Sequence, residues 1–232
     1  MIDTVVCILA AVERELAPLR RRCAASTRCL PHRFIVTGVG KAGAAIAATA
    51  AVLEEKPALL LQVGCAGAYP ESGLEIGDVV IATGEVFADE GAMTPAGFLD
   101  LRALGLPVLG ADLYNEIPTA SPPPSLWSAV ASKVAGRFAC RSGRLATVST
   151  GSGTGELAIE RARRWSPLAE SMEGAAVALV GRKYGCPFVE IRGISNRVGA
   201  RDRSTWDIDG ACEHAAEVAA LLLQSPSLLE ST

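Results

Sequence analysis

The chain has 232 residues, half of them hydrophobic, and 22 basic and 25 acidic side chains give it a net charge of −3. This composition is sufficient for one large core, and we predict that residues 1–232 form a single domain. The charges are mixed along the chain without a basic face. The sequence therefore disfavours nucleic acid as a partner and favours a small molecule.

The first apolar run, residues 4–11, lacks a basic leader, and no segment sustains the apolar length of a membrane helix. We therefore expect a cytoplasmic protein without a membrane partner. The seven cysteines are scattered and form no C-x-x-C pair. They indicate reduced core thiols, so we expect neither a metal nor a cofactor.

Runs rich in Val and Ile alternate with Ala- and Leu-rich stretches at helical spacing, which predicts an α/β sheet with helices on its faces. Strands are predicted over residues 4–10, 33–37, 58–63, 78–82, 143–148 and 187–193. Helices are predicted over residues 13–23, 41–54, 154–165, 171–184 and 209–223. Residues 88–124, rich in Gly, Pro and Asp, are predicted to be irregular, and the chain after residue 224 to be frayed.

Glu15 follows the first predicted strand, at the edge where ligands gather in open α/β sheets. A carboxylate in this place can serve as a general base. Glu13 and Glu15 would also stabilise the first turn of the next helix through its dipole. The sequence leaves both interpretations open.

Two glycine-rich turns follow predicted strands, at residues 37–43 and 63–68, and each lets backbone N–H groups approach a ligand closely. No acidic residue follows a second strand at the distance that the dinucleotide fingerprint requires. A Rossmann dehydrogenase is therefore disfavoured. Tight packing of strand against helix explains these glycines equally well.

Glu173 stands in a stretch of small and apolar residues, 170–178. A buried carboxylate is costly unless it finds donors, and a sugar diol offers two hydroxyl donors to one carboxylate. Glu173 is therefore a candidate ligand of a sugar, with stabilisation of a helix N-terminus as the alternative. Arg192 and Asn196 end the apolar strand of residues 187–193, either as site residues or as turn formers.

Together and in this order, these elements resemble the nucleoside phosphorylase and nucleosidase superfamily, over residues 5–220. The resemblance implies a three-layer sandwich with a central mixed β-sheet flanked by helices. It implies that Met172 packs beneath a ribose, that Glu173 accepts from the 2′ and 3′ hydroxyls, and that residues 149–154 border the base. The residues implied to contact the substrate are Gly64, Cys65, Ala66, Gly153, Thr154, Met172 and Glu173.

Phosphorylases of this superfamily have an arginine for phosphate two residues before the first glycine of the second glycine turn, where this chain has Gln62. An amide lacks the charge-assisted fork that arginine offers to phosphate. Glu15 matches the carboxylate with which the nucleosidases deprotonate water. The resemblance therefore implies water as the acceptor, with a phosphorylase as the rival reading. Cys65 stands where related nucleosidases keep a serine near the water.

Methylthioadenosine/S-adenosylhomocysteine nucleosidases have an aspartate in the position of Asn196, which protonates the leaving adenine. An amide cannot give up a proton, so it suits a base that leaves as an anion, such as hypoxanthine. Adenine stays open, because Asn also pairs with its N6 and N7 edge. Residues 87–91, residues 196–203 and Trp206 are similar to the futalosine hydrolase family, which cleaves a hypoxanthine nucleoside with a carboxyphenyl ketone at its 5′ end.

The resemblance implies that Glu15 is the general base and that Arg192 positions the carboxylate of Glu15 or the water. It also implies that Asn196 stabilises the leaving purine. The partners implied are a purine nucleoside and water. Members are commonly homo-oligomers, so we expect self-association. The alternative outside enzymes is a nucleoside-binding module without catalysis, which the joint retention of Glu15, Glu173 and Asn196 disfavours.

Overall fold

The computed structural model describes residues 5–230. Its strands are β1 Val6–Ala10, β2 His32–Val36, β3 Leu59–Ala68, β4 Val79–Phe87, β5 Gly91–Thr94, β6 Gly97–Asp100, β7 Glu116–Pro118, β8 Cys140–Thr147, β9 Ala169–Ser171 and β10 Phe188–Arg197. Its helices are α1 Glu13–Ala24, α2 Lys41–Glu55, α3 Pro124–Val134, α4 Gly155–Trp165, α5 Gly174–Tyr184 and α6 Ile208–Leu223, with 3-10 turns at Arg203–Thr205 and Pro226–Leu229.

The main sheet is mixed and has the strand order β10-β4-β8-β9-β3-β1-β2, with β7 paired to β4. Strand β10 also pairs with β3, so β3, β10, β4, β8 and β9 close into a ring from which β1 and β2 extend. Strands β1, β2, β3 and β10 run parallel, whereas β10 and β4 are antiparallel. The predicted three-layer α/β sandwich with a mixed sheet is confirmed, and the ring is a feature that the strand predictions did not include.

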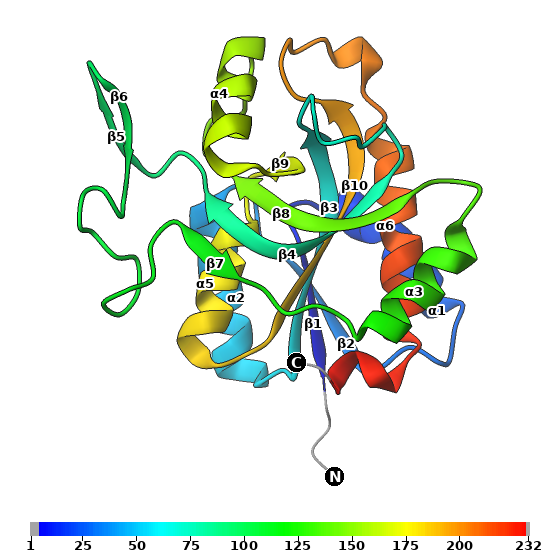
Figure 1. Ribbon diagram of the computed structural model, residues 1–232. Coiled ribbons are helices and arrows are strands. Elements are labelled where there is room, and N and C mark those ends of the chain that lie inside the picture. The colour runs from blue at the N-terminus through cyan, green and yellow to red at the C-terminus, as the bar shows by residue number, and fades with distance from the viewer. Residues whose placement is uncertain (1–4, 231–232) are drawn as a thin grey trace.

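Helices cover both faces of the sheet, with α2 and α5 on one side and α1, α3 and α6 on the other (Figure 1). Helix α2 can lie close to the sheet because its buried positions, Ala44, Ala48 and Ala51, recur at helical spacing and are small. They pack in one cluster with Leu9 and Leu60 of the strands. Helix α4 lies at one end of the sheet, above β8 and β9 (Figure 1).

The prediction of irregular structure over residues 88–124 was wrong in part. Strands β5 and β6 form a hairpin that projects from the body of the molecule (Figure 1), and β7 pairs with β4. The hairpin alternates between exposed and half-buried positions, so it has no apolar run to mark it.

The structure differs from the predictions at further places. The helix predicted over residues 171–184 begins at Gly174, because Ser171 belongs to β9. The prediction of fraying after residue 224 was wrong, since the turn Pro226–Leu229 buries Leu228 completely. Helix α3 was not predicted, and Thr4 of the first predicted strand lies outside the described residues. Within residues 5–230, no helix has the length and apolar character needed to cross a membrane.

Candidate active site

The carboxyl ends of β1, β3 and β10 lie side by side because these strands pair in parallel. A cavity of about 320 Å³ opens at this edge of the sheet. It gathers most of the residues that the sequence singled out, namely Glu15, Cys65, Ala66, Met172, Glu173, Arg192 and Asn196. Gly153 borders a smaller cavity that shares Gly151, Glu170 and Asn196 with the first, whereas Thr154 lines neither.

The side chain of Glu15 lies in the first turn of α1 and is almost fully buried. One carboxylate oxygen, Oε2, accepts from the backbone N–H groups of Ala11 and Val12 at 3.1 and 3.4 Å. The other, Oε1, accepts from the N–H of Cys65 at 3.0 Å. The two sequence interpretations of Glu15 therefore hold together geometrically: it stabilises its helix start and also faces the cavity, with one acceptor position of Oε1 free.

Arg192 links the charged groups of the cavity. Its guanidinium donates from Nε to Glu190 at 2.7 Å, from Nη2 to Glu173 at 3.2 Å and from Nη1 to the carbonyl of Cys65 at 3.2 Å, and Nη1 lies 3.9 Å from Glu15. Burial alone lowers the pKa of Arg192, but the three carboxylates outweigh burial and raise this pKa overall. The guanidinium therefore stays charged and fixes the distance between Glu15 and Glu173.

Glu173 is the residue immediately before α5, and it is 3% exposed. Its Oε1 accepts from the N–H of Gly40 at 2.9 Å, and its Oε2 accepts from Arg192 and from the N–H of Met172 at 3.3 Å. The first glycine turn thus contributes a backbone donor to this carboxylate. One acceptor position remains free on Oε1.

Gly64 does not itself line the cavity, but it lies against the side chains of Glu15 and Arg192. A Cβ at this position would collide with the carboxylate of Glu15 and would lie 2.7 Å from Nη1 of Arg192. The glycine of the second turn is therefore required by the close approach of these two side chains. Beside it, a hydrogen bond with the Cys212 thiol lowers the pKa of the Cys65 thiol.

Asn196 also lines the cavity, and its amide Nδ2 lies 3.0 Å from the position that a Cβ on Gly67 would take. Its Oδ1 accepts from the hydroxyl of Ser195 at 2.7 Å. Thr154, implied by the resemblance to border the base, instead caps α4 by accepting from the N–H of Leu157 at 3.2 Å. Within the loop of residues 149–154, Gly151 lines the cavity, whereas Gly153 borders the smaller one.

A second layer of carboxylates, which the sequence analysis missed, lies behind Arg192. Glu190 and Glu85 are fully buried and meet beneath Gly174, where a Cβ would lie 2.7 Å from Oε1 of Glu190 and 2.7 Å from Cδ of Glu85. Thr147 donates to Glu85 at 2.5 Å and accepts from the N–H of Ala175 at 2.7 Å. Burial and the neighbouring Glu190 raise the pKa of Glu85 well above its ordinary value, which favours the protonated form of this carboxyl group.

Gln62, the residue in the position of the phosphate-binding arginine, is fully buried in β3 and does not line the cavity. Neither its Oε1 nor its Nε2 has a hydrogen-bond partner among the described residues. It neighbours Glu190 in the register of β3 and β10. Position 62 therefore belongs to the polar layer behind the cavity and offers no charge to an anion there.

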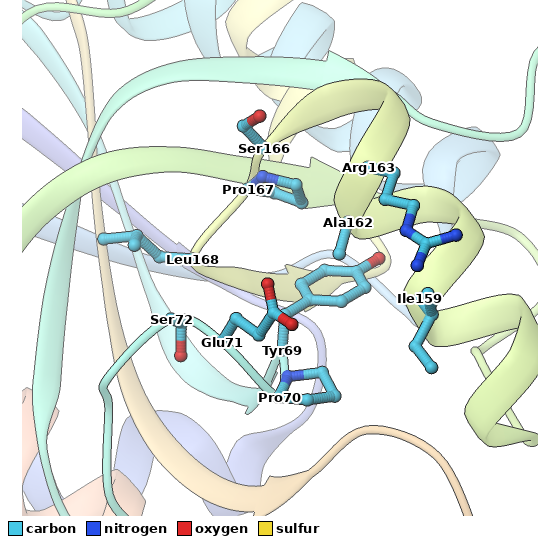
Figure 2. A pocket seen from close by; sticks show the side chains of 10 residues that line it. All are labelled: Tyr69, Pro70, Glu71, Ser72, Ile159, Ala162, Arg163, Ser166, Pro167 and Leu168. Atoms are coloured by element: carbon cyan, nitrogen blue, oxygen red, sulfur yellow. The ribbon is translucent and has the colours of Figure 1, made fainter.

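A second cavity, also of about 320 Å³, lies between α4 and the segment that follows β3 (Figure 2). Figure 2 shows the ring of Tyr69 lying across it, with Ile159 and Arg163 of α4 opposite. None of the residues that the sequence singled out as candidate site residues lines this cavity. We assign chemistry to the first cavity, because buried charged groups converge there.

The chain is similar to known proteins of one superfamily. Residues 6–225 match the family described as the phosphorylase superfamily. The futalosine hydrolase of Acidothermus cellulolyticus is 37% identical over 186 residues, which cover 78% of this chain and 72% of that protein. The futalosine hydrolase of Thermus thermophilus is 33% identical over 193 residues, covering 82% and 80% of the two chains.

Among solved structures, a methylthioadenosine/S-adenosylhomocysteine nucleosidase from Colwellia psychrerythraea, in complex with adenine, superposes with a TM-score of 0.80 at 19% identity. The match covers 97% of this chain and 96% of that one, and it supports the fold. The chain therefore belongs to the phosphorylase superfamily and, within it, to the futalosine hydrolase family.

Proposed function

We propose that this protein hydrolyses the N-glycosidic bond of futalosine and releases hypoxanthine, as a step of menaquinone synthesis. The observation that carries the proposal is the arrangement of Glu15 and Glu173 on either side of Arg192 in one buried cavity. One carboxylate is free to accept from water and the other from a sugar, and the relatives at 33–37% identity are futalosine hydrolases.

In the proposed reaction, Oε1 of Glu15 takes a proton from a water molecule as the water oxygen bonds to C1′ of the ribose. The bond between C1′ and N9 breaks, and its electron pair leaves with the purine. Asn196 donates a hydrogen bond to the purine anion, which then takes up a proton to give hypoxanthine. This reaction needs a general base, Glu15, but no general acid at position 196, because the purine leaves as an anion.

The sugar gains positive charge as the glycosidic bond breaks, and Glu173 stabilises it. One hydroxyl of the diol takes the free acceptor position on Oε1. A second hydroxyl would displace the 3.3 Å hydrogen bond from the N–H of Met172, which is the longest of the three bonds to this carboxylate. Because the sugar is more positive in the transition state, this contact favours the transition state over the ground state.

The test is a product analysis of the purified protein with futalosine, inosine and methylthioadenosine, each with and without phosphate. We expect hypoxanthine from futalosine at a rate that phosphate does not change. Formation of a sugar 1-phosphate would indicate a phosphorylase, and preferential release of adenine from methylthioadenosine would indicate the related nucleosidase activity. Tight binding of nucleoside without release of base would support a binding module.

The proposal includes a cytoplasmic site of action and self-association. All seven cysteines are free thiols, as is usual in reducing compartments. The projecting hairpin exposes Met93 and Leu99, which are apolar side chains suited to contact a second copy. Sedimentation equilibrium of the purified protein tests the second part, and a monomer at all concentrations would contradict it.

A further inference from the structure

Glu170 is the one carboxylate among the lining residues of the cavity that the proposed reaction leaves unused. It lies in the three-residue strand β9, and its side chain is 10% exposed. It also borders the smaller adjoining cavity of about 50 Å³, together with Gly151 and Asn196. Glu170 is therefore placed at the end of the site where the base of a nucleoside would lie.

The sheet register sets Glu170 across from Asn196. Gly67 of β3 pairs with Glu170 on one side and with Asn196 on the other. Directly paired residues of neighbouring strands project from the same face of a sheet. Because Gly67 lacks a side chain, the amide of Asn196 can lie over it, on the way towards β9. The carboxylate and the amide thus flank one space from two sides.

The carboxylate of Glu170 is held firmly but keeps an open acceptor position. Its Oε2 accepts from the hydroxyl groups of Tyr69 at 2.9 Å and Ser152 at 2.6 Å, and its Oε1 accepts from the N–H of Ser152 at 2.8 Å. The guanidinium of Arg161 lies 3.7 Å from Oε2. A carboxylate has about four lone-pair positions, so one remains on Oε1, beside Gly151.

The edge of a purine decides what such a carboxylate recognises. In hypoxanthine N1 carries a hydrogen and is a donor, whereas in adenine N1 is an acceptor. We propose that Glu170 is a specificity-determining residue, whose Oε1 accepts the N1–H of a 6-oxopurine while Asn196 contacts the N7 side. Adenine would place its N1 lone pair against the carboxylate and is rejected, since an unpaired buried acceptor is costly. This inference rests on the proposed function and names the base that it requires.

The test compares futalosine with its N1-methyl derivative, which lacks the N1–H. With the natural protein, we expect methylation to lower kcat/KM at least roughly tenfold, as loss of a hydrogen bond to a charged group does. In Glu170→Gln, futalosine should lose at least roughly tenfold in kcat/KM, while the methyl derivative changes little, so that the ratio of the two substrates collapses.

The matched control is Tyr69→Phe, which removes one donor to Glu170 and leaves the carboxylate in place. Tyr69→Phe should change kcat/KM by the same factor for futalosine and for its N1-methyl derivative. If Glu170→Gln also lowers both substrates by the same factor, Glu170 only fastens the loop at Ser152 and the proposal is wrong. The same conclusion follows if methylation has no effect on the natural protein.

Binding of free bases separates this inference from the proposed function. Calorimetry with hypoxanthine, 1-methylhypoxanthine and adenine needs neither hydrolysis nor the correct 5′ group. Hypoxanthine should bind at least roughly tenfold more tightly than the other two, and Glu170→Gln should abolish the difference. If futalosine is not cleaved but this preference is present, the proposed function fails and the role of Glu170 stands. Equal binding of the three bases would overturn it.

Discussion

The proposed sugar side of the cavity, formed by Glu15, Glu173 and Arg192, and its proposed base side, formed by Glu170, Asn196 and residues 149–154, hold their polar groups in different ways. On the sugar side the side chains are at most 7% exposed and are bonded to each other and to backbone N–H groups of strand ends and helix starts.

On the base side, a loop is fastened by carboxylates. Glu170 accepts from the N–H of Ser152, and Asp89 accepts from the N–H groups of Ser149 and Thr150 at 2.6 and 3.1 Å. This difference indicates that the sheet and the loop have different roles. The sheet fixes the groups proposed for catalysis, where small displacements are costly, whereas the proposed base specificity depends on a loop that side chains tie down.

The largest effect should come from the sugar side, with Glu15→Gln. The amide cannot take a proton from water, so kcat for hypoxanthine release should fall at least roughly 10²-fold, as general bases typically contribute that much or more. Thermal unfolding should verify that the variant is folded. The matched control is Glu13→Gln, an exposed neighbour paired with Arg20, which should keep normal kcat. Near-normal turnover of Glu15→Gln would remove Glu15 from the catalytic role.

The second largest effect should come from a change at Glu190, which lies behind Arg192 and contacts its guanidinium. Glu190→Gln keeps an oxygen for Nε of Arg192 but removes the negative charge that faces it. Arg192 should then shift towards Glu173 and Glu15, and kcat should fall about tenfold or more because small misplacements at the reacting centre are costly. Activity over a pH range should show an altered profile as well as a lower maximum.

Glu85→Gln is the control for this variant, because it leaves Glu190 and its contact with Arg192 in place and puts a neutral amide where the raised pKa of Glu85 favours a neutral carboxyl group. Its activity should stay near normal. Loss of kcat in both variants with unchanged pH profiles would mean that the pair serves only the packing of the core.

On the base side, Asn196→Asp should change specificity more than rate. A carboxylic acid in this position can protonate a leaving adenine, which an amide cannot do. We expect the ratio of kcat/KM for methylthioadenosine to that for futalosine to rise, by roughly tenfold or more. A ratio that stays fixed, measured with both substrates in the same preparations, would exclude Asn196 as the residue that reads the base.

The sequence was sufficient to predict most of the main sheet and most of its flanking helices, and it singled out Glu15, Glu173 and Arg192, which the structure brings together in one cavity. Glu173 was identifiable because a carboxylate in a small, apolar stretch needs donors, and Glu15 because it follows a buried strand. These are local signals, and they coincide with the places where the structure gathers charge.

The remaining features depend on contacts between distant segments. Glu85 and Glu190 meet because β4 and β10 are antiparallel neighbours, and no local pattern sets that register. Glu170 stood in the same stretch as Glu173, but only the pairing of Gly67 with two strands brings it across from Asn196. Three-residue strands such as β9 are too short to show a period.

The smallest effect is on stability, and it concerns the carboxyl group of Glu85. In the unfolded chain a glutamate has a pKa of about 4.3. Burial and Glu190 raise the pKa of Glu85 in the folded protein, so between the two values the folded protein binds more protons than the unfolded chain. The contribution of Glu85 to the free energy of unfolding is therefore greatest below a pH of about 4, and it is lost as the pH rises through the pKa of Glu85 in the folded protein.

Glu85→Gln carries no proton to lose, so its free energy of unfolding, relative to the natural protein, should increase as the pH rises above about 4, by about 1.4 kcal/mol for each unit by which the pKa is raised. Urea unfolding at a series of pH values measures this difference. Glu54→Gln, an exposed change on α2, should show no such trend. A difference that is constant with pH would mean that Glu85 is ionised in the folded protein, and that Arg192 then balances one more negative charge than proposed.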